Sequence, residues 1–537
     1  MIYMKILMIC TEKLPVPAVL GGAIQTYIAG ALPYLGKQHD ITVLGITESS
    51  LPDQETVDGI RFVRVPGKIF EVYREGVAVY VKSNQFDLIH IFNRPRLVLA
   101  VREAAPHSKI TLSMHNDMFN TEKIDPVEAN AALEEVAGIV TVSDYIGNVI
   151  RGLYPQASSK IRTIYSGVDH TRFLPGSHPK MQSTRSQLRK THGLENKTVI
   201  LFAGRLSPNK GVDKLVRALP ELSKKFKDLA LVIVGSKWFS QDDTTDFIAY
   251  VRALSKKLTV PVVATGFVSP DEIQNWFAAA DLFVCTSIWQ EPLARVHYEA
   301  MAAGLPIVTT ARGGNPEVIL PGENGLVVEN PEDPAAFAEK ISTILSNKSL
   351  MKKMGEKGRS LAISEYNWER VASDILAAWQ DAMDWASEYV PMEENLAVAA
   401  EITAKENQTV AAEITAEEDQ TVAAEITAKE NQTVAAEITA EDTIHETVGS
   451  ADEELQDLNA GPAIETEETH ITNPLRRSIR TFPKESDAIS KRDRLRETLQ
   501  EMLRESIQES VRSSLSETIT MAETMREIRS KLRRKKS

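Results

Sequence analysis

Residues 281–310 read DLFVCTSIWQEPLARVHYEAMAAGLPIVTT, two short apolar runs with a helical pattern between them. The runs DLFVCTS and LPIVTT are rich in apolar and β-branched residues, which is typical of strands buried on both faces of a parallel sheet. The segment between them continues from about Leu293 in helix-forming residues. Because a strand, a helix and a strand in this order make a parallel unit, these residues predict an α/β fold.

The same alternation continues on both sides of this unit. Residues 5–170 contain the runs KILMIC, DITVLGI, IRFVRV, FDLIHIF, KITLSMH, GIVTVS and KIRTIYSGV. Residues 198–329 add TVILFAGRL, LALVIVGS, VVATGF and GLVVE. A polar, basic stretch from His178 to Asn196 separates the two series. Two doubly wound, Rossmann-like α/β domains are the simplest interpretation.

These patterns set the expected domain boundaries. An N-terminal domain over residues 1–170 is followed by a linker, 171–197, and by a C-terminal domain, 198–365. Residues 366–390 are expected to form a helix that packs back on the N-terminal domain. Helical patterns also cover Pro334 to Asn347 and Trp368 to about Tyr389.

The formal net charge of −13 over 537 residues is unevenly distributed. Residues 392–470 carry −19 and residues 471–537 carry +7, which leaves −1 for residues 1–391. A nearly neutral globular part gives no argument for binding to nucleic acid.

Two further features concern the compartment. No apolar run reaches the ~18 residues that cross a bilayer, and MIYMKILMIC is too short and lacks a cleavage site for a signal peptide. The two cysteines, Cys10 and Cys285, lie in apolar runs, fit a reducing compartment and offer no metal-ligand spacing. We therefore expect a cytoplasmic protein without a transmembrane segment and without a metal site.

Composition changes abruptly after about residue 390. VAAEITAKENQT, VAAEITAEEDQT and VAAEITAKENQT repeat with a period of 12 over residues 398–433. Each unit offers little apolar surface to bury, so the acidic low-complexity segment 391–483 is expected to be disordered.

The last segment, residues 484–537, is charged and helix-forming. Apolar residues spaced by four run from Leu495 to Ile519, and this stripe winds around the expected helix instead of holding one face. Two alternatives stay open: a helix that binds a protein partner or self-associates, and a solvated tail. The basic end KLRRKKS also suits peripheral contact with an anionic surface.

In each of the two expected domains, a loop that contains glycine follows the first strand. Gly21 and Gly22 precede the helical pattern IQTYIAGALPYL, where bare backbone lets a phosphate approach a helix start. AGRLSPNKGV brings Gly204, Arg205 and Lys210 to a turn after a strand. Two cations at such a strand end favour an anion site at the edge of the sheet. The alternatives are an ordinary helix start at Gly22 and a solvated loop at Lys210.

Glu291 and Glu299 stand eight residues apart after the strand DLFVCTS. If a helix begins near Leu293, its N-terminal amides face the crevice at the sheet edge, with Glu291 just outside the helix and Glu299 about two turns inside. Carboxylates suit hydroxyl pairs, because each accepts two hydrogen bonds. This spacing is common by chance, so the prediction depends on the position after a buried strand. Cys285 and Trp289, nearby, are expected to serve packing.

With these elements in place, the chain resembles glycosyltransferase family 4, retaining enzymes of the GT-B fold. The resemblance covers about residues 4–388. It rests on segments that occur in the family's order: AGRLSPNKGVD, GFVSPDEI, the glutamate pair, EAMAAGLPIVTT, GGNPEVI and NGLVV. It implies two Rossmann-like domains that face a cleft, with a nucleotide-sugar donor held by the second domain.

The resemblance also implies roles for individual residues. Arg205 and Lys210 would hold the donor diphosphate, Glu299 the ribose hydroxyls, and Glu291 the donor sugar. The backbone at Val268 would border the base.

Two residues of the first domain complete the implied site. Gly22 would approach the diphosphate, and His115, in the sequence SMHND, would lie beside the transferred sugar. The implied catalytic set is Glu291, His115, Arg205 and Lys210; the implied donor-binding set is Gly22, Gly204, Val268, Leu293, Ala294, Arg295 and Glu299.

One segment departs from the family pattern. Many members have a glycine after the first glutamate of the pair, whereas Pro292, Leu293 and Ala294 follow it here, and Arg295 adds a cation towards the same crevice. The departure bears on which sugar is bound. The segments WQEPLARVHYEAMAAGLPIVTT and RGGNPEVI are similar to those of a subgroup of bacterial spore-coat-associated glycosyltransferases.

The resemblance therefore implies a retaining hexosyltransferase that uses a nucleoside-diphosphate sugar, in the first place a UDP-sugar, and no metal or other cofactor. It implies a part in spore coat or cell-surface polysaccharide formation, with a carbohydrate, lipid-linked or protein acceptor. Two alternatives remain: a non-catalytic spore coat or scaffold protein that keeps the fold, and a nucleotide-sugar epimerase of the same fold.

Overall fold

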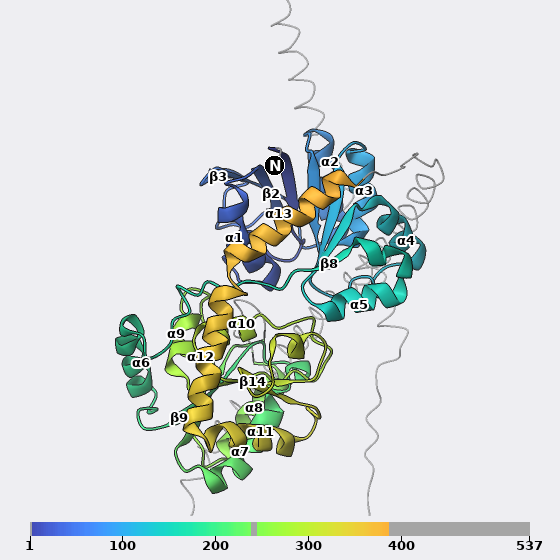
Figure 1. The fold of residues 1–537 in the computed structure, drawn as a ribbon. Coiled ribbons are helices and arrows are strands. Elements are labelled where there is room, and N and C mark those ends of the chain that lie inside the picture. Colours follow the sequence, from blue (N-terminus) through green and yellow to red (C-terminus); the bar gives the residue numbers. More distant parts are fainter. Residues whose placement is uncertain (1–2, 238–243, 386–537) are drawn as a thin grey trace, which may run out of the picture. The chain divides into compact units, whose positions relative to one another are not determined.

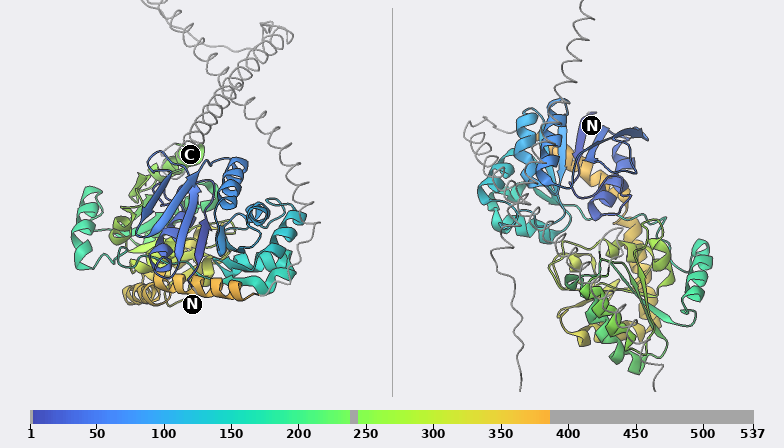
Figure 2. Two further views of the ribbon diagram at one scale, coloured as in Figure 1. Left: turned by 90° about the horizontal axis from the view of Figure 1, so that it is seen from above. Right: turned by 180° about the vertical axis from the view of Figure 1, so that it is seen from behind.

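The computed structural model describes residues 3–237 and 244–385 (Figure 1). Within them the chain forms an eight-stranded sheet and a six-stranded sheet, each with helices on both faces (Figure 2). The predicted repeat segment 391–483 and the predicted tail 484–537 lie outside the described residues.

The first sheet has the strand order β3-β4-β2-β1-β5-β6-β7-β8. All its neighbouring strands are parallel except β3, which pairs antiparallel with β4. The strands are β1 (Lys5–Ile9), β2 (Asp40–Ile46), β3 (Gln54–Val57), β4 (Ile60–Val65), β5 (Leu88–Phe92), β6 (Lys109–Met114), β7 (Gly138–Thr141) and β8 (Ile161–Thr163).

Both faces of this sheet are buried. Ile6 and Met8 of β1 point into one apolar cluster with α1 (Ala23–Leu35) and α13 (Trp368–Asp384). Leu7 and Ile9 of the same strand point into a second cluster. That cluster includes α2 (Phe70–Lys82), α3 (Val98–Ala104), α4 (Pro126–Glu135) and α5 (Asp144–Leu153). Burial on both sides explains why the strands appear as continuous apolar runs.

The second sheet is parallel throughout and has the order β11-β10-β9-β12-β13-β14. Its strands are β9 (Thr198–Ala203), β10 (Leu229–Val234), β11 (Val262–Gly266), β12 (Leu282–Val284), β13 (Ile307–Thr310) and β14 (Gly325–Val328).

Two apolar clusters cover the two faces of the second sheet. One includes α7 (Val212–Lys225), α8 (Asp246–Lys256) and α11 (Pro334–Leu345). The other includes α9 (Ile273–Ala279), α10 (Val296–Ala302) and residues of α12 (Lys348–Ser364). Short 3₁₀ helices complete the fold: η1 (Pro95–Leu97), η2 (Pro155–Lys160), η3 (Pro208–Lys210) and η4 (Asn315–Val318).

Each sheet contains a point at which the strand order reverses. In the second sheet β9 lies between β10 and β12, so the chain proceeds to one side from β9 to β11 and to the other side from β12 to β14. The first sheet reverses in the same way between β1 and β5. Ligands of open α/β sheets bind outside the carboxyl ends of the strands at such a reversal.

The structure adds elements that the sequence patterns did not indicate. The short polar strand β3 and the helix α12 had no counterpart among the predicted elements. The segment 171–197, predicted as a linker, contains α6 (Pro179–Thr191). Arg185 and Arg189 of α6 both pair with Asp281, so this helix is attached to the start of β12. The domain boundaries themselves stay a prediction.

The helix α13 follows the second sheet in sequence but packs on the first. Trp379 is fully buried there, and its indole Nε1 donates to His90 Nδ1 at 3.2 Å. His90 lies in the middle of β5, and its Nδ1 is also 2.8 Å from Thr111 Oγ1. Burial lowers the pKa of His90 to about 3.

This depressed pKa predicts acid sensitivity. Between pH 6.5 and about 3 the unfolded chain binds a proton at His90 that the folded chain does not, so the free energy of unfolding falls as the pH falls through this range. We expect the thermal unfolding midpoint to drop from pH 7 to pH 5, and to drop less in His90→Gln, which keeps an acceptor for Trp379. Equal drops in both proteins would contradict the assignment.

Candidate active site

The predicted site residues of the second domain gather at the reversal of strand order. β9 and β12 are neighbours, with Ile200 opposite Leu282. The chain leaves β9 into Gly204 and Arg205, and it leaves β12 into the loop that contains Glu291. Because parallel strands end at the same edge of a sheet, these two loops lie side by side.

The centre of this region is an ion pair between Lys210 and Glu291. Lys210 Nζ lies 2.5 Å from Glu291 Oε2, and both side chains are mostly buried. The same carboxylate oxygen accepts hydrogen bonds from Ser287 Oγ at 2.9 Å and from Trp289 Nε1 at 2.8 Å. Trp289 therefore does more than pack, contrary to the expectation from the sequence.

Glu291 is held in its ionised form. Burial by itself raises the pKa of this carboxyl, but the charge of Lys210 and the hydrogen bonds from Lys210, Ser287 and Trp289 outweigh burial and bring the pKa below its ordinary value. The site thus presents a fixed, buried carboxylate.

Lys210 is positioned by a tight turn against the loop after β12. It ends η3, and Gly211 follows with φ of 64°, in the left-handed region that favours glycine. A side chain at Gly211 would place its Cβ 2.3 Å from the carbonyl oxygen of Thr286. Thr286 Oγ1 donates to the carbonyl of Lys210 at 2.6 Å, so the two loops are joined directly.

Glu291 is positioned by the loop after β13. The amide of Gly314 donates to the carbonyl of Glu291 at 2.8 Å. Gly313 adopts φ of 57°, and a Cβ on it would lie 2.0 Å from the same carbonyl oxygen. Thr310 Oγ1 donates to the carbonyl of Ser287 at 2.7 Å, which fixes the start of the Glu291 loop.

Arg205 lies at the same edge of the sheet. Burial lowers the pKa of its guanidinium, and the charge of Glu291 acts in the opposite direction. Gly204 precedes it, and its carbonyl oxygen would lie 2.0 Å from a Cβ on Gly235, so the ends of β9 and β10 approach very closely.

The helix after Glu291 begins later than predicted. We expected it to start near Leu293, but α10 begins at Val296. The amide of Ala294 donates to Asn315 Oδ1 at 3.1 Å, which holds residues 292–294 in a loop. Leu293 is buried in the apolar cluster of the sheet. The prediction of a helix start near Leu293 is therefore wrong, because a buried side chain from a distant loop captures the local backbone.

Arg295 is engaged instead of projecting as a free cation. Its Nη1 donates to Ser166 Oγ at 2.9 Å, and its guanidinium lies over the Trp368 ring at 5.4 Å. The Arg295 Nη2 atom is 3.9 Å from Glu299 Oε1. Burial raises the pKa of Glu299, while the charges of Arg295 and Arg172 partly offset this rise.

Val268 follows β11 and packs against the apolar cluster on the α10 side of the sheet. In the sheet, β10 and β9 lie between β11, which Val268 follows, and β12, which precedes the loop of Glu291. The predicted role of its backbone at the base stays a prediction, as do the ligand roles of the other residues.

Gly22 lies at the end of the loop between β1 and α1. It is the N-cap of α1 and has φ of 110°. A Cβ at this position would collide with Gln25, whose Nε2 donates to the carbonyl of Leu14 at 3.1 Å. The positive φ explains the glycine, because other residues rarely adopt this backbone conformation.

His115 follows β6 at the carboxyl edge of the first sheet. Its Nε2 is 3.1 Å from Ser113 Oγ, and its ring meets the Tyr27 ring edge-on at a centroid distance of 4.8 Å. Burial lowers the pKa of His115 to about 3, and the charges of His90 and Arg295 contribute in the same direction. The imidazole is therefore neutral near pH 7.

Several residues that build the site were missed at the sequence level. Asn93 Oδ1 accepts from the amides of His115 and Asn116 at 3.0 and 2.9 Å, and Asn315 Oδ1 accepts from the amide of Ala294 in the same way. Ser287 was also missed; its hydroxyl donates to the carboxylate of Glu291. A usable signal exists for Asn93, which directly follows the buried strand β5.

Other predicted properties concern metals, thiols and membranes. In residues 3–237 and 244–385, no group of three or more His, Cys, Asp or Glu side chains is placed to hold a metal ion. Cys10 and Cys285 are free and buried. No helix of the described ranges is long and apolar enough to cross a membrane.

Two Rossmann-like sheets, with charged loops at the reversal of the second, define an α/β protein of the class whose ligands bind at the carboxyl ends of the strands. Two family models match the chain, "Glycosyltransferase Family 4" over residues 21–172 and "Glycosyl transferases group 1" over residues 184–361.

Two bacterial relatives each align with more than two thirds of the chain. Spore coat protein SA of Bacillus subtilis (strain 168) is 42% identical over 377 residues, 70% of this chain and 99% of that protein. YtcC, a glycosyltransferase homologue of the same strain, is 41% identical over 388 residues, 72% of this chain and 95% of that protein. The chain therefore belongs to the group 1 and family 4 glycosyltransferases, and it is an enzyme of this class.

Solved structures establish the GT-B fold. Anabaena Alr3699/HepE, crystallised in complex with UDP-glucose, covers 70% of this chain and 100% of its own with a TM-score of 0.55 and 21% identity. Sucrose-phosphate synthase from Thermosynechococcus elongatus covers 71% of this chain and 99% of its own with a TM-score of 0.58 and 21% identity.

The buried pair gives a stability prediction. Lys210→Met leaves Glu291 without its counter-charge, and we expect a loss of about 3 kcal/mol in the free energy of unfolding. The double variant Lys210→Met/Glu291→Leu should recover most of this loss in denaturant titrations, because the buried carboxylate that lost its partner is removed as well. Lys224→Met, which removes the exposed Lys224–Glu221 pair, serves as control and should change stability by less than about 1 kcal/mol. A double variant as unstable as the single one would contradict this account.

Proposed function

We propose that this glycosyltransferase transfers a sugar from a UDP-sugar to an acceptor with retention of anomeric configuration, and that it needs no metal ion. The observation that carries the proposal is the buried Lys210–Glu291 pair beside Arg205 at the reversal of the second sheet. Two cations suit a diphosphate, and a fixed carboxylate suits sugar hydroxyls. The UDP-glucose complex of the Anabaena protein of the same fold supports the choice of donor.

In the proposed mechanism the leaving group is stabilised electrostatically. As the bond from the sugar to the diphosphate breaks, negative charge grows on the diphosphate, and Arg205 and Lys210 are already oriented to receive it. The acceptor attacks the face from which the diphosphate leaves, which preserves the configuration. Glu291 holds the sugar hydroxyls, and Glu299 holds the ribose.

The residues of the first domain take part from the other side of the donor. Gly22 lets the backbone approach the diphosphate, because no side chain stands at this helix start. His115 is neutral, so it orients the transferred sugar through hydrogen bonds and carries no charge itself.

We further propose that the product belongs to the spore coat or to a cell-surface polysaccharide. The support is the name and the 42% identity of Spore coat protein SA, which covers 70% of this chain.

A donor panel tests the proposal. The full chain is incubated with UDP-, GDP- and ADP-sugars, with release of nucleoside diphosphate and thermal stabilisation as the measurements. We expect a UDP-sugar to raise the unfolding midpoint and to be hydrolysed slowly without acceptor. Binding of no donor would overturn the proposal in favour of a non-catalytic scaffold, and conversion of the donor into an epimer would overturn it in favour of epimerisation.

Two glutamate variants separate binding from turnover. Glu299→Ala should weaken nucleotide binding, because it removes the proposed ribose ligand. Glu291→Gln should leave nucleotide binding nearly unchanged and lower turnover roughly 10²-fold, in the range for loss of one stabilising group in the transition state. Glu221→Ala, on the exposed face of α7, is the control. Equal, negligible effects of the two site variants would refute the assigned roles.

The low pKa of His115 predicts that this histidine does not affect how kcat/KM changes with pH near neutrality. Because the imidazole is neutral from pH 5 to 8, its protonation should not shape kcat/KM in this range. His115→Gln should lower kcat roughly tenfold through a lost hydrogen bond and leave the shape of the profile unchanged. A bend near pH 6.5 that disappears in the variant would show a titrating histidine instead.

A further inference from the structure

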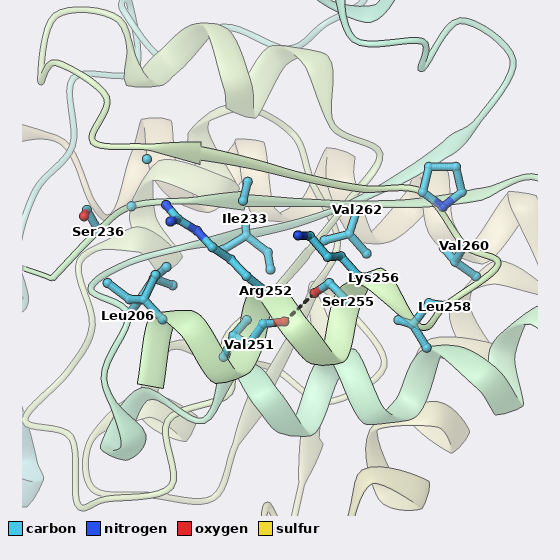
Figure 3. Close-up of a pocket in the computed structure, with 15 residues that line it drawn as sticks. Leu206, Ile233, Ser236, Val251, Arg252, Ser255, Lys256, Leu258, Val260 and Val262 are labelled. Atoms are coloured by element: carbon cyan, nitrogen blue, oxygen red, sulfur yellow. Dashed lines mark hydrogen bonds between the residues drawn. The ribbon is translucent and has the colours of Figure 1, made fainter. Parts of the chain in front are cut away.

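A hollow of about 400 Å³ lies between α8 and the strands β10 and β11, at the edge of the second sheet (Figure 3). Its wall is mostly apolar and includes Ile233, Val251, Val260 and Val262. None of the residues assigned to the donor lines this hollow. It is therefore a separate feature of the second domain.

The strand that borders the hollow is an edge strand. β11 pairs with β10, and among the described residues no strand pairs with its other side. Val262, Ala264 and Gly266 alternate along β11 and all line the hollow. An open strand edge beside an apolar floor accepts an added strand whose alternate side chains enter the hollow.

The rim of the hollow is basic. Arg252 and Lys256, one turn apart on α8, are exposed, and Figure 3 shows both side chains extending from α8 towards the strands. Within residues 3–237 and 244–385 neither forms an ion pair; Arg252 Nη1 donates to Thr244 Oγ1 at 3.1 Å. A second hollow of about 410 Å³ shares Val260 and Pro261 with the first and is lined by three lysines, Lys197, Lys224 and Lys227.

The chain itself contains a segment that matches this surface. In the repeat VAAEITA every second residue is apolar. In an extended strand these residues, Val410, Ala412, Ile414 and Ala416 of the second copy, would share one face. This second copy spans residues 410–421. It has four acidic residues, at positions 413, 417, 418 and 419, and no basic residue. The seven residues of VAAEITA are long enough to pair along the whole of β11, which has five residues.

The connection is long enough. Val410 lies 25 residues beyond Trp385, the last described residue, and such a connection spans up to ~80 Å. Trp385 packs on the first sheet, where Lys109 Nζ donates to its carbonyl at 2.8 Å, so the connection must run from the first domain to β11 of the second. A domain of 160–170 residues has a diameter of roughly 40 Å, so the extended connection matches the length of two such domains. Attachment to the same chain also keeps the repeat at a high effective concentration.

We propose that the acidic repeat of residues 410–421 docks as an added strand on the outer edge of β11. Its apolar face enters the hollow, and its acids meet Arg252 and Lys256. A docked repeat also protects the open edge of the sheet from pairing with another chain.

Cysteine cross-linking in the full chain tests the contact. Ala264→Cys is combined with Ala412→Cys; the native Cys10 and Cys285 are buried and stay in place. The control pair is Lys353→Cys with Ala412→Cys, since Lys353 is exposed on α12. We expect intramolecular disulfide to form at least roughly tenfold faster in the first pair, because docking raises the effective concentration. Equal rates would overturn the proposal.

Charge reversal tests the electrostatic part in the same cross-linking assay. Arg252→Glu/Lys256→Glu should slow disulfide formation, and so should Glu413→Lys/Glu417→Lys/Glu418→Lys. The two sets combined should restore it. Lys348→Glu/Lys353→Glu, on the exposed side of α12, is the matched control and should have no effect.

Two outcomes would count against the proposal. If the combined variant does not recover, the acids of the repeat do not meet Arg252 and Lys256. If the disulfide joins two chains and forms faster at higher protein concentration, the occupant is a second copy and not the repeat of the same chain. Thermal unfolding of each variant checks that the second domain is still folded.

Discussion

Burial of both faces of each sheet is the constraint on which the rest of this structure depends. Alternate residues of β1 enter two different apolar clusters, and the strands of the second sheet are covered in the same way. In the central strands of each sheet, charged groups are favoured where strands end, since the strand interior is covered on both faces and offers them little water. Arg64, inside β4, is the kind of exception that needs a partner, because it is buried and pairs with Glu55 of the neighbouring strand β3 at 2.6 Å. The reversal of strand order between β9 and β12 opens a gap between the flanking helices at one of these edges. The charged loops of the site lie at this edge, where the ends of the strands are not covered by helices.

The same burial explains why the site is built from interlocking loops. A charge pair such as Lys210–Glu291 is costly to desolvate, and it persists because hydrogen bonds from Ser287 and Trp289 satisfy the carboxylate. Glycines at positions 211 and 313 let neighbouring backbones come within contact distance of these loops. The result is a preorganised pair of opposite charges. A ligand that carries both phosphates and hydroxyls would meet groups that are already oriented, with little rearrangement needed on binding.

The strands and the site could be predicted to different extents. Apolar, β-branched runs identified the strands of both sheets except β3, whose residues QETV are mostly polar and lie at an exposed edge. The charged residues of the loops could be picked out because each follows a buried strand. Their contacts could not, since Asn315 captures the amide of Ala294 from 21 positions away and so delays the start of α10. Periodicity describes a segment by its own residues, whereas such a boundary depends on a partner distant in sequence.

Arg295 shows how a departure from the family pattern takes effect through packing. The sequence suggested an additional cation for the donor crevice. In the structure its guanidinium is bonded to Ser166 and stacked on Trp368, the first residue of α13. The indole of Trp368 in turn fits against Gly30 of α1, where any side chain would collide with it. Since Arg295 also lies 3.9 Å from Glu299, the proposed ribose ligand is linked through one buried cation to the helix that joins the two sheets. The family's glycine after Glu291 would alter the backbone of the loop at residue 292. The link between Glu299 and Trp368 depends instead on the long cationic side chain of Arg295.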